Sequence, residues 1–405
     1  MRAGADGQGR GRMSARPPVY LDHQATTPLD PRVLERMLPY LSEHFGNPHS
    51  LGHAFGWRAE SAVAQAREQV AALIGAAPDE IVFTSGATEA NNLALKGLAE
   101  AYRGRKGHLV TSAVEHKCVL ESCRHLARQG ATVTVLPVDS RGRVDPGAVA
   151  AAIGDDTLAV SIMAAQNEIG TLQPIAEIGA VCAERGVIFH TDAAQAAGKI
   201  PLDVAAMGIG LMSLSAHKMY GPKGIGALYV RRRPRVRLVA QMDGGGQEGG
   251  LRSGTLSPAL CVGFGAACAF AAVEMAEEAA RLTGLRDRLH RKLTESLPDV
   301  DLNGDAERRL PGNLNIAFGG ADGEALVAAL GDVALSTGSA CSTGSVEPSY
   351  VLAALGLDPD RARASVRIGL GRFTTEDDVE YAAERIVAAV RAARDGTAIR
   401  AGAAP

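Results

Sequence analysis

Short apolar runs alternate with amphipathic stretches between about residues 55 and 275. Helical patterns such as TEANNLALKGLAEAYR and IAEIGAVCAERG separate several of the runs. This alternation predicts an α/β domain built on a mostly parallel sheet of seven strands between helices. Ligands of such sheets bind beyond the carboxyl ends of the strands, so the polar residues that end the runs are expected to line one cleft. The predicted strands are EIVFTSG (80–86), HLVTSAV (108–114), TVTVLPV (132–138), LAVSIMAAQN (158–167), VIFHTDAAQ (187–195), GLMSLSAHK (210–218) and GIGALYVRR (224–232).

The pattern changes at about residue 274. A long charged helical stretch is followed by the apolar runs NLNIAFGG and SVRIGLGRF and by a final helix, TEDDVEYAAERIVAAVRAAR. These elements predict a smaller α+β domain at the C-terminal end. The expected division is a disordered leader (1–18), a large domain (29–273), a small domain (19–28 with 274–395) and a disordered tail (396–405).

Composition narrows the function classes. The chain has 405 residues, of which 46% are hydrophobic and 21% charged, and its formal net charge is −3. These values are typical of a soluble protein with two domains, and they disfavour nucleic acid or an anionic membrane as a direct partner. No apolar run is expected to span a bilayer, which takes about 20 residues. The opening Gly- and Arg-rich stretch lacks an apolar segment, so a disordered leader or a start at Met13 is favoured over a signal or transit peptide.

Six cysteines are spread along the chain without a C-x-x-C pair: Cys118, Cys123, Cys182, Cys261, Cys268 and Cys341. The spacing disfavours a disulfide framework or a zinc site and fits a reducing, cytoplasmic location. Most of the six have apolar or alanine neighbours, as small buried hydrophobes do. Cys341 differs, because DVALSTGSACSTGSVEPSYVL surrounds it with small polar residues that predict a mobile loop. A thiol there is either an accident of composition or a nucleophile.

Lys218 follows a predicted strand end in MSLSAHKMYGPKGIG, directly before a Gly- and Pro-rich turn. Most lysines are solvated surface charges. This one is flanked by Ser215 and His217, both able to bind an anion, and an amine held at that place can form a Schiff base with an aldehyde.

Asp192 and Gln195 end another strand in VIFHTDAAQAAG. A carboxylate of this kind can pair with the ring nitrogen of pyridoxal phosphate, and the amide can bind the ring hydroxyl. A helix N-cap is the alternative interpretation of the aspartate. In EIVFTSGATEANN, Gly86 permits close backbone approach, and Ala87 and Thr88 begin a helix whose free N–H groups favour a phosphate.

Three further residues have two interpretations each. His116 follows a strand in TSAVEHKCVL and is either structural or catalytic. Asn167 ends a predicted strand in MAAQNEIGT and is either a turn residue or a ligand of a cofactor or substrate. Arg367 lies on a predicted strand, where its guanidinium suits either a substrate carboxylate or a salt bridge. Taken together, these side chains supply what an amino-acid-handling pyridoxal phosphate enzyme requires.

The chain resembles the cysteine desulfurases in the class V aminotransferase group of fold-type I pyridoxal phosphate enzymes. The resemblance runs from about Val19 to Arg394 and rests on YLDHQATTPLDP, FGNPHS, EIVFTSGATEANN, NEIGT, HTDAAQ, SAHKMYGPKGIGALYVRR, RSGT, STGSACSTGSVEPSYVL and RIGLGRFTTE. It implies a transferase that removes sulfur from L-cysteine, gives L-alanine and serves iron–sulfur cluster assembly or thiolation. It also implies a homodimer and a sulfur-acceptor protein such as an iron–sulfur scaffold.

The resemblance assigns the residues as follows. Lys218 is the Schiff-base lysine, Asp192 and Gln195 bind the ring, and His116 stacks on it and moves protons. Asn167 and Arg367 hold the cysteine carboxylate, and Cys341 receives the sulfur as a persulfide. No metal is expected in the free enzyme, with Cys341 a candidate ligand of a cluster shared with a scaffold. The phosphate is assigned to Ala87, Thr88, Ser215, His217 and, from the partner subunit, Thr255.

Two features depart from the family pattern. The glycine loop reads GGGQEGGLRSGT, with Gln247 and Gly249 where many relatives have a basic, histidine-containing version, and the chain ends in a short Ala/Gly tail. Rival interpretations are a selenocysteine lyase, a transaminase of the same fold, and a non-catalytic subunit that only binds the cofactor.

Overall fold

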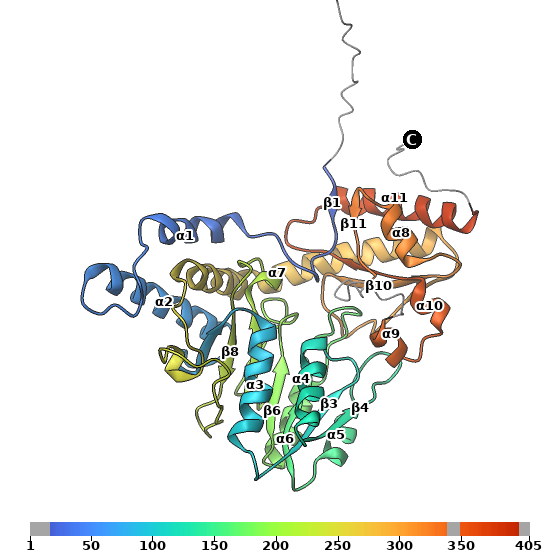
Figure 1. The fold of residues 1–405 in the computed structure, drawn as a ribbon. Coiled ribbons are helices and arrows are strands. Elements are labelled where there is room, and N and C mark those ends of the chain that lie inside the picture. Colours follow the sequence, from blue (N-terminus) through green and yellow to red (C-terminus); the bar gives the residue numbers. More distant parts are fainter. Residues whose placement is uncertain (1–16, 338–348, 397–405) are drawn as a thin grey trace, which may run out of the picture.

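A seven-stranded sheet forms the centre of the computed structural model, which describes residues 17–337 and 349–396 (Figure 1). The strand order is β2-β8-β7-β6-β5-β3-β4, and every neighbouring pair is parallel except the two that β8 makes with β2 and β7. The predicted mostly parallel sheet is therefore confirmed. Its strands are β2 (Ile81–Thr84), β3 (His108–Ser112), β4 (Thr132–Leu136), β5 (Thr157–Ser161), β6 (Ile188–Asp192), β7 (Leu211–Ser215) and β8 (Gly226–Val230).

Alternating strand residues face two different helical layers. Leu109 packs with helices α3 and α4, whereas the next residue, Val110, packs with helices on the other face. On β7, Leu211 likewise packs with the α3 and α4 layer, and Met212 packs with the helices on the other face. Because both faces are covered, nearly all residues of the central strands are buried, whereas the edge strand β4 is mostly not. One layer holds α3 (Ala87–Ala101) and α4 (Lys117–Arg128), and the other holds α2 (Ala54–Leu73), α5 (Pro146–Ala152), α6 (Ile175–Glu184) and the first half of α7.

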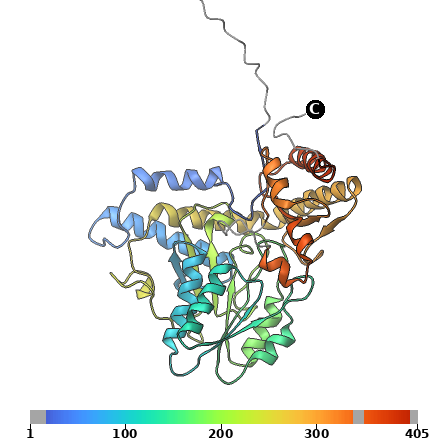
Figure 2. The ribbon, with the colours of Figure 1, turned by 45° about the vertical axis from the view of Figure 1, so that its right-hand side comes forward.

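Helix α7 (Pro258–Ser296) joins the two parts of the molecule, as both views show (Figures 1 and 2). Its first half contributes Phe264 and Cys268 to the core of the large domain. Its second half contributes Leu285 and Leu289 to a separate apolar core. A single rigid element therefore fixes the distance between the two cores.

One expectation from sequence needs correction. Helix α7 is long and apolar enough, by length and composition, to cross a membrane, although the core helix of a soluble protein passes the same test. Half of its most apolar stretch is buried inside the chain, against α2 and helix α1 (Pro31–Ser42). Small residues caused the discrepancy, since alanine and glycine make this stretch apolar without making it look like a hydrophobic run.

The smaller core is built around an antiparallel sheet with the order β12-β10-β9. Val19 and Leu21 from the N-terminal end of the described chain pack into this core, and β1 pairs in parallel with β11. This packing supports the interpretation that residues 19–28 belong with the C-terminal domain. The elements are β1 (Val19–Tyr20), β9 (Val300–Leu302), β10 (Asn313–Phe318), α8 (Gly323–Ala329), β11 (Val333–Ala334), α9 (Tyr350–Ala354), α10 (Pro359–Arg363), β12 (Ser365–Gly369) and α11 (Glu376–Arg394).

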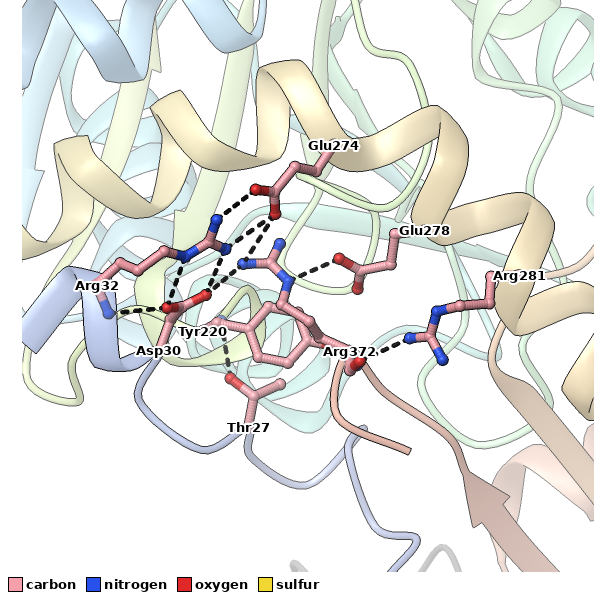
Figure 3. Close-up of polar contacts among 8 residues, drawn as sticks. All are labelled: Thr27, Asp30, Arg32, Tyr220, Glu274, Glu278, Arg281 and Arg372. Carbon is pink, nitrogen blue, oxygen red and sulfur yellow. Dashed lines mark hydrogen bonds and ion pairs between the residues drawn. The ribbon is translucent and has the colours of Figure 1, made fainter. Parts of the chain in front are cut away.

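A cluster of buried charges closes the junction between the two domains (Figure 3). Arg372, which follows β12, bonds Asp30 at 2.8 Å and Glu278 on α7 at 2.7 Å, and its guanidinium lies 4.3 Å from the centre of the Tyr220 ring. Burial alone would raise the pKa of Asp30, but hydrogen bonds from Arg32 and Arg372 outweigh it and lower that pKa to about 2. The cluster joins the N-terminal segment, α7, the small domain and the turn after β7.

We expect Arg372→Met to lower the free energy of unfolding by about 3–5 kcal/mol, because it leaves the carboxylate of Glu278 without its cation and removes one of the two cations bonded to buried Asp30. Arg288→Met is the matched control, since Arg288 also joins α7 to the C-terminal region but pairs with the more exposed Glu376 and Glu380. That change should cost less than about 1 kcal/mol. Urea unfolding of both variants measures the two losses, and equal losses would contradict the assigned role of the buried cluster.

Candidate active site

The polar strand ends predicted from sequence meet at one edge of the sheet. Asp192 is the last residue of β6 and Ser215 is the last residue of β7, and these two strands are parallel. Strand β2 runs in the same direction as β7, because both are antiparallel to β8, so the start of α3 lies at this edge too. The carboxyl edge is where open α/β sheets bind their ligands.

Lys218 lies on a 3₁₀ turn (Ala216–Lys218) that follows β7 directly. Its amine nitrogen donates to the backbone carbonyl oxygens of Gln24 at 2.6 Å and Ala25 at 2.7 Å. Both carbonyls belong to the N-terminal segment that packs with the small domain. The lysine is therefore held at the domain junction, partly buried, rather than solvated at the surface.

The carboxylate of Asp192 is buried and fixed at both oxygens. One oxygen accepts from the backbone N–H of Ala194 at 2.9 Å, as expected of a turn-capping aspartate. The other accepts from the side-chain amide of Asn91 on α3 at 2.7 Å. The capping interpretation is thus correct in part, and Asn91 is a site residue that sequence reasoning missed, although it lies one turn after Thr88 in the quoted motif.

His116 is the N-cap of α4, and its Nδ1 accepts from the backbone N–H of Cys118 at 3.2 Å. The Cys118 thiol also lies 3.0 Å from Nδ1 and 3.1 Å from the Asn91 amide nitrogen. Since the backbone N–H can only donate, Nδ1 is an acceptor and a neutral His116 carries its proton on Nε2. Cys118, which sequence reasoning grouped with the structural cysteines, therefore lies in the site.

The other described cysteines are buried, as expected. Burial raises the pKa of Cys123, Cys182 and Cys261 to about 12, and it raises that of Cys268 further. None of these four thiols ionises near neutral pH, which excludes them as nucleophiles. Cys341 lies outside the described residues, and so do any contacts that it makes.

Arg367 is buried on β12 and already has an acidic partner. Its Nη2 donates to Asp22 at 2.8 Å and its Nη1 to the backbone oxygen of Asn167 at 3.2 Å, while its Nε finds no partner among the described residues. The salt-bridge interpretation therefore holds for this structure. A substrate carboxylate would share the guanidinium with Asp22 or replace it.

Asn167 needs a correction, because it does not end a strand. Strand β5 stops at Ser161, and Asn167 lies six residues later in a loop closed by the Ala165–Leu172 bridge. A hydrogen bond from Thr171 to Arg141 and the packing of Gln166 inside this loop hold it in place. The sequence after Ser161 continues with apolar residues, so the pattern did not show that β5 ends there.

The start of α3 is suited to an anion. Gly86 has a φ of 153°, and within the described residues no side chain caps the helix, so its first N–H groups are open. A Cβ at Gly226 would lie 2.7 Å from the Cα of Gly86, which shows how closely the turn packs on β8. A Cβ at Gly86 itself would reach to 4.0 Å from the Ser215 hydroxyl. The turn at Gly86, from which Ala87 and exposed Thr88 begin α3, thus lies next to the Ser215 hydroxyl.

His217 supports this site as a neutral ring. Its Nδ1 lies 3.1 Å from the Thr26 hydroxyl. Burial, followed by the positive charges of Lys218, Lys223 and Lys199, lowers the pKa of His217 to about 4. The ring is therefore a polar partner rather than a cation at neutral pH.

Thr255 is exposed. The glycine loop reaches α3 through Arg252, which bonds Glu89 at 2.9 Å. The two glycine-loop residues that depart from the family pattern are accommodated locally: Gln247 accepts from the Gly254 N–H at 2.8 Å, and Gly249 has a φ of 63° that favours glycine.

Two buried carboxyl groups flank the site and were missed by sequence reasoning. Glu115 accepts from the Ser112 hydroxyl at 2.7 Å and the Met163 N–H at 2.9 Å, while its second oxygen has no partner in the described chain. Burial raises the pKa of Glu115 to about 8, and the charge of Asp192 adds to the effect. Glu168, bonded by Ser349 at 2.5 Å, also has a pKa raised by burial. No group of three metal-ligating side chains occurs in the part of the chain that the structure describes.

Comparison with known proteins gives consistent matches. The aminotransferase class-V family model matches residues 19–382. A protein named cysteine desulfurase from Mus musculus is 58% identical over 378 residues, which cover 93% of this chain and 82% of the relative. Cysteine desulfurase IscS from Rickettsia bellii is 52% identical over 93% of this chain and 92% of its own.

Solved structures agree with this family assignment. A NifS-like protein has a TM-score of 0.87 and 37% sequence identity, covering 92% of this chain and 99% of its own. A structure titled SspA in complex with cysteine has a TM-score of 0.78 and 40% sequence identity, and the match covers 88% of this chain and 100% of its own.

The class-V aminotransferase family uses pyridoxal phosphate, and the residues at the sheet edge fit this cofactor. The uncapped start of α3 beside the side-chain-free turn at Gly86 suits its phosphate. Asp192 supplies a fixed carboxylate and Lys218 a fixed amine at the ends of neighbouring strands. These are the groups that the cofactor needs for its ring nitrogen and its aldehyde.

We expect the stability of the protein to depend on pH through Glu115. In the folded protein the carboxyl group keeps a proton up to a pH of about 8, whereas the unfolded chain releases it near 4.5, so stability falls as the pH rises between these values. Glu115→Gln keeps the carbonyl acceptor and removes the ionisation. Unfolding of the loaded enzyme should give similar stabilities at pH 5 and a variant more stable by about 2–4 kcal/mol at pH 8.5.

Glu100→Gln, which changes an exposed carboxylate on α3, is the control and should follow the wild-type curve at every pH. Parallel curves for Glu115→Gln and the wild type would show that Glu115 is ionised in the folded protein.

Proposed function

We propose that this protein, which belongs to the class-V aminotransferase family and within it to the cysteine desulfurases, takes the sulfur atom from L-cysteine, releases L-alanine and carries the sulfur on Cys341. The proposal depends on one observation: Asp192 at the end of β6 and Lys218 just after the end of β7 lie at the same edge of the sheet, and hydrogen bonds hold both side chains in place. The SspA structure, whose title reports a complex with cysteine, supports L-cysteine as the substrate.

Pyridoxal phosphate, when bound to Lys218, supplies an electron sink that weakens the bonds around the α-carbon of the bound amino acid. Asp192 keeps the ring nitrogen protonated through an ion pair, and Asn91 holds its carboxylate in place. The Lys218 amine, once free, is placed to move the α-proton, and the Nε2–H of His116 is a second proton donor. Arg367 binds the substrate carboxylate in competition with Asp22.

The overall transfer balances without a further reagent. The C–S bond of cysteine breaks and an S–S bond forms at Cys341, so L-cysteine and the thiol become L-alanine and a persulfide. The sulfur of the persulfide is oxidised and the β-carbon is reduced to a methyl group. A transaminase of this fold would need Lys218, Asp192 and Arg367 but no thiol at position 341.

We further propose an iron–sulfur scaffold or another sulfur acceptor as the partner that takes the persulfide sulfur. The relatives named cysteine desulfurase IscS support transfer to a protein acceptor. A cytoplasmic location is part of the proposal and is supported by the five described cysteines, all of which are free thiols.

We expect Cys341→Ala to keep the visible absorbance of the bound cofactor but to form no persulfide, and Lys218→Ala to lose turnover altogether. Mass spectrometry of the thiol and measurement of alanine release check both. Cys268→Ala, which changes a buried thiol, should form the persulfide normally. Sulfide release at the wild-type rate from Cys341→Ala would favour a lyase instead.

A homodimer completes the proposal, and an exposed apolar band supports it. On α1, Leu34, Leu38 and Leu41 are between 40% and 60% exposed, and Phe45 after α1 and Trp57 in the first turn of α2 are exposed by more than half. Both helices project beyond the edge of the sheet (Figures 1 and 2). Contiguous apolar residues of this kind mark protein–protein interfaces, and a second copy of this chain is the occupant we propose. Thr255, exposed in the single chain, would then enter the partner's phosphate site.

We expect Leu38→Glu with Leu41→Glu to convert the dimer to a monomer, because two charges would be buried in the interface. Light scattering after gel filtration measures the mass. Val135→Glu, on the exposed edge of β4, is the control and should leave the dimer intact. A monomeric wild-type protein at micromolar concentration would contradict the homodimer.

A further inference from the structure

Lys199 is a second lysine beside the proposed cofactor site, and the mechanism above does not use it. Its amine donates to the Oε1 of Gln195 at 3.1 Å. It lines a cavity of about 20 Å³ together with His23, Gln24, Tyr220 and Glu278. No carboxylate lies within ion-pair distance of the Lys199 amine in residues 17–337 and 349–396. Part of the side chain is accessible through the cavity, but protein surrounds the amine.

The charged groups around Lys199 act in opposite directions. Burial, followed by the positive charge of Lys218, lowers the pKa of Lys199 to about 7, and Arg367 adds a smaller effect of the same sign. Glu278 on α7 opposes them. His23, which faces the same cavity, is neutral because burial lowers its pKa to about 4. A buried lysine with one hydrogen-bond partner is costly, so its position calls for a function.

The two partners of Gln195 fix the orientation of its amide. The Lys199 amine donates to the amide oxygen, which is the orientation that the Gln24 carbonyl also requires. The backbone oxygen of Gln24 can only accept, and it lies 2.8 Å from the amide nitrogen. The nitrogen has two hydrogens, and the second has no acceptor among the described residues. Gln195 therefore offers an N–H, not a C=O, to any further group in the site.

The same Gln24 oxygen also accepts from Lys218 at 2.6 Å. Gln195 and Lys218 thus share one carbonyl, which places the free N–H of the amide beside the amine that would hold the cofactor. An N–H at the ring oxygen of pyridoxal phosphate stabilises the anionic form of that oxygen, whereas a C=O would repel it. Without Lys199, the Gln195 amide would keep only the hydrogen bond to Gln24 and would be held less firmly in this orientation.

We propose that Lys199 is a positioning residue that holds the Gln195 amide with its free N–H directed at the ring oxygen of pyridoxal phosphate. The proposal rests on the proposed function, because it needs the cofactor at Lys218. It assigns to Lys199 an effect that passes through Gln195 and not through direct contact with the cofactor.

The test is a double-mutant cycle on the loaded enzyme, with the visible absorbance of the bound cofactor followed from pH 6 to pH 10. We expect Gln195→Leu to raise the midpoint of the colour change by about 0.5–1 pH unit, because it removes the N–H from the ring oxygen. Lys199→Met should raise it by less, because it loosens the amide that Gln24 still holds. The double variant should match Gln195→Leu alone, since Lys199 has nothing left to orient. Lys199→Arg, which keeps a donor, should lie near the wild type.

Additive shifts in the double variant would overturn the proposal, because they would show that the charge of Lys199 acts directly. A Lys199→Met midpoint equal to that of the wild type would also overturn it. If Lys199→Met does not fold, Lys199→Gln replaces it in the cycle and should give an intermediate midpoint, since glutamine can bond the amide in either orientation. A wild-type protein that binds no cofactor would refute the proposed function, whereas a coloured wild type with an unshifted variant would refute only the role of Lys199.

Discussion

The N-terminal segment from Leu21 to Asp30 ties the lysine turn to the small domain, and the site depends on this docking. Its carbonyls at Gln24 and Ala25 hold the Lys218 amine, and the Thr27 N–H donates to the carbonyl of His217 at 2.9 Å. The same segment is joined to β12, where Gly369 donates to the Leu21 carbonyl at 2.7 Å. Because backbone carbonyls cannot move independently of the chain, the position of the lysine is set by the contact between the two domains.

The electrostatics of the site follow from this enclosure. Lys218 and Arg367 bring two cationic groups together, while the pKa of Lys199 is lowered to about 7, His217 is kept neutral and Glu115 keeps its proton. Burial thus keeps His217 and Glu115 neutral, because no partner would balance their charges. The remaining positive charges can be balanced by a bound anion. A cofactor phosphate and an amino-acid carboxylate are anions of this kind, and the uncapped start of α3 adds a third favourable element.

Local patterns predicted much of this arrangement, and long-range contacts account for the remainder. The seven strands, the start of α3 and the position of Lys218 at a strand end follow from short apolar runs and turn residues, which act over a few positions. The Asp22–Arg367 ion pair joins residues 345 positions apart, and the burial of Glu115 depends on Met163 from a neighbouring strand connection. Neither contact can be predicted from the residues next to each other in the sequence, because the partners are far apart along the chain. Lys199 was missed for the same reason, since a lysine after a Gly is usually solvated and only the packing of α7 encloses this one.

The flanks of the Cys341 segment connect the thiol to both halves of the site. Before the segment, Ser336 and Arg367 exchange two backbone hydrogen bonds of 3.2 and 2.6 Å. After it, the Ser349 hydroxyl bonds Glu168 and the Tyr350 hydroxyl donates to the carbonyl of Glu115 at 2.6 Å. Cys341 follows Ser336 by five positions, and an extended chain of that length spans at most about 18 Å. The sequence therefore limits how far the thiol can lie from the strand that carries the arginine proposed to bind the substrate.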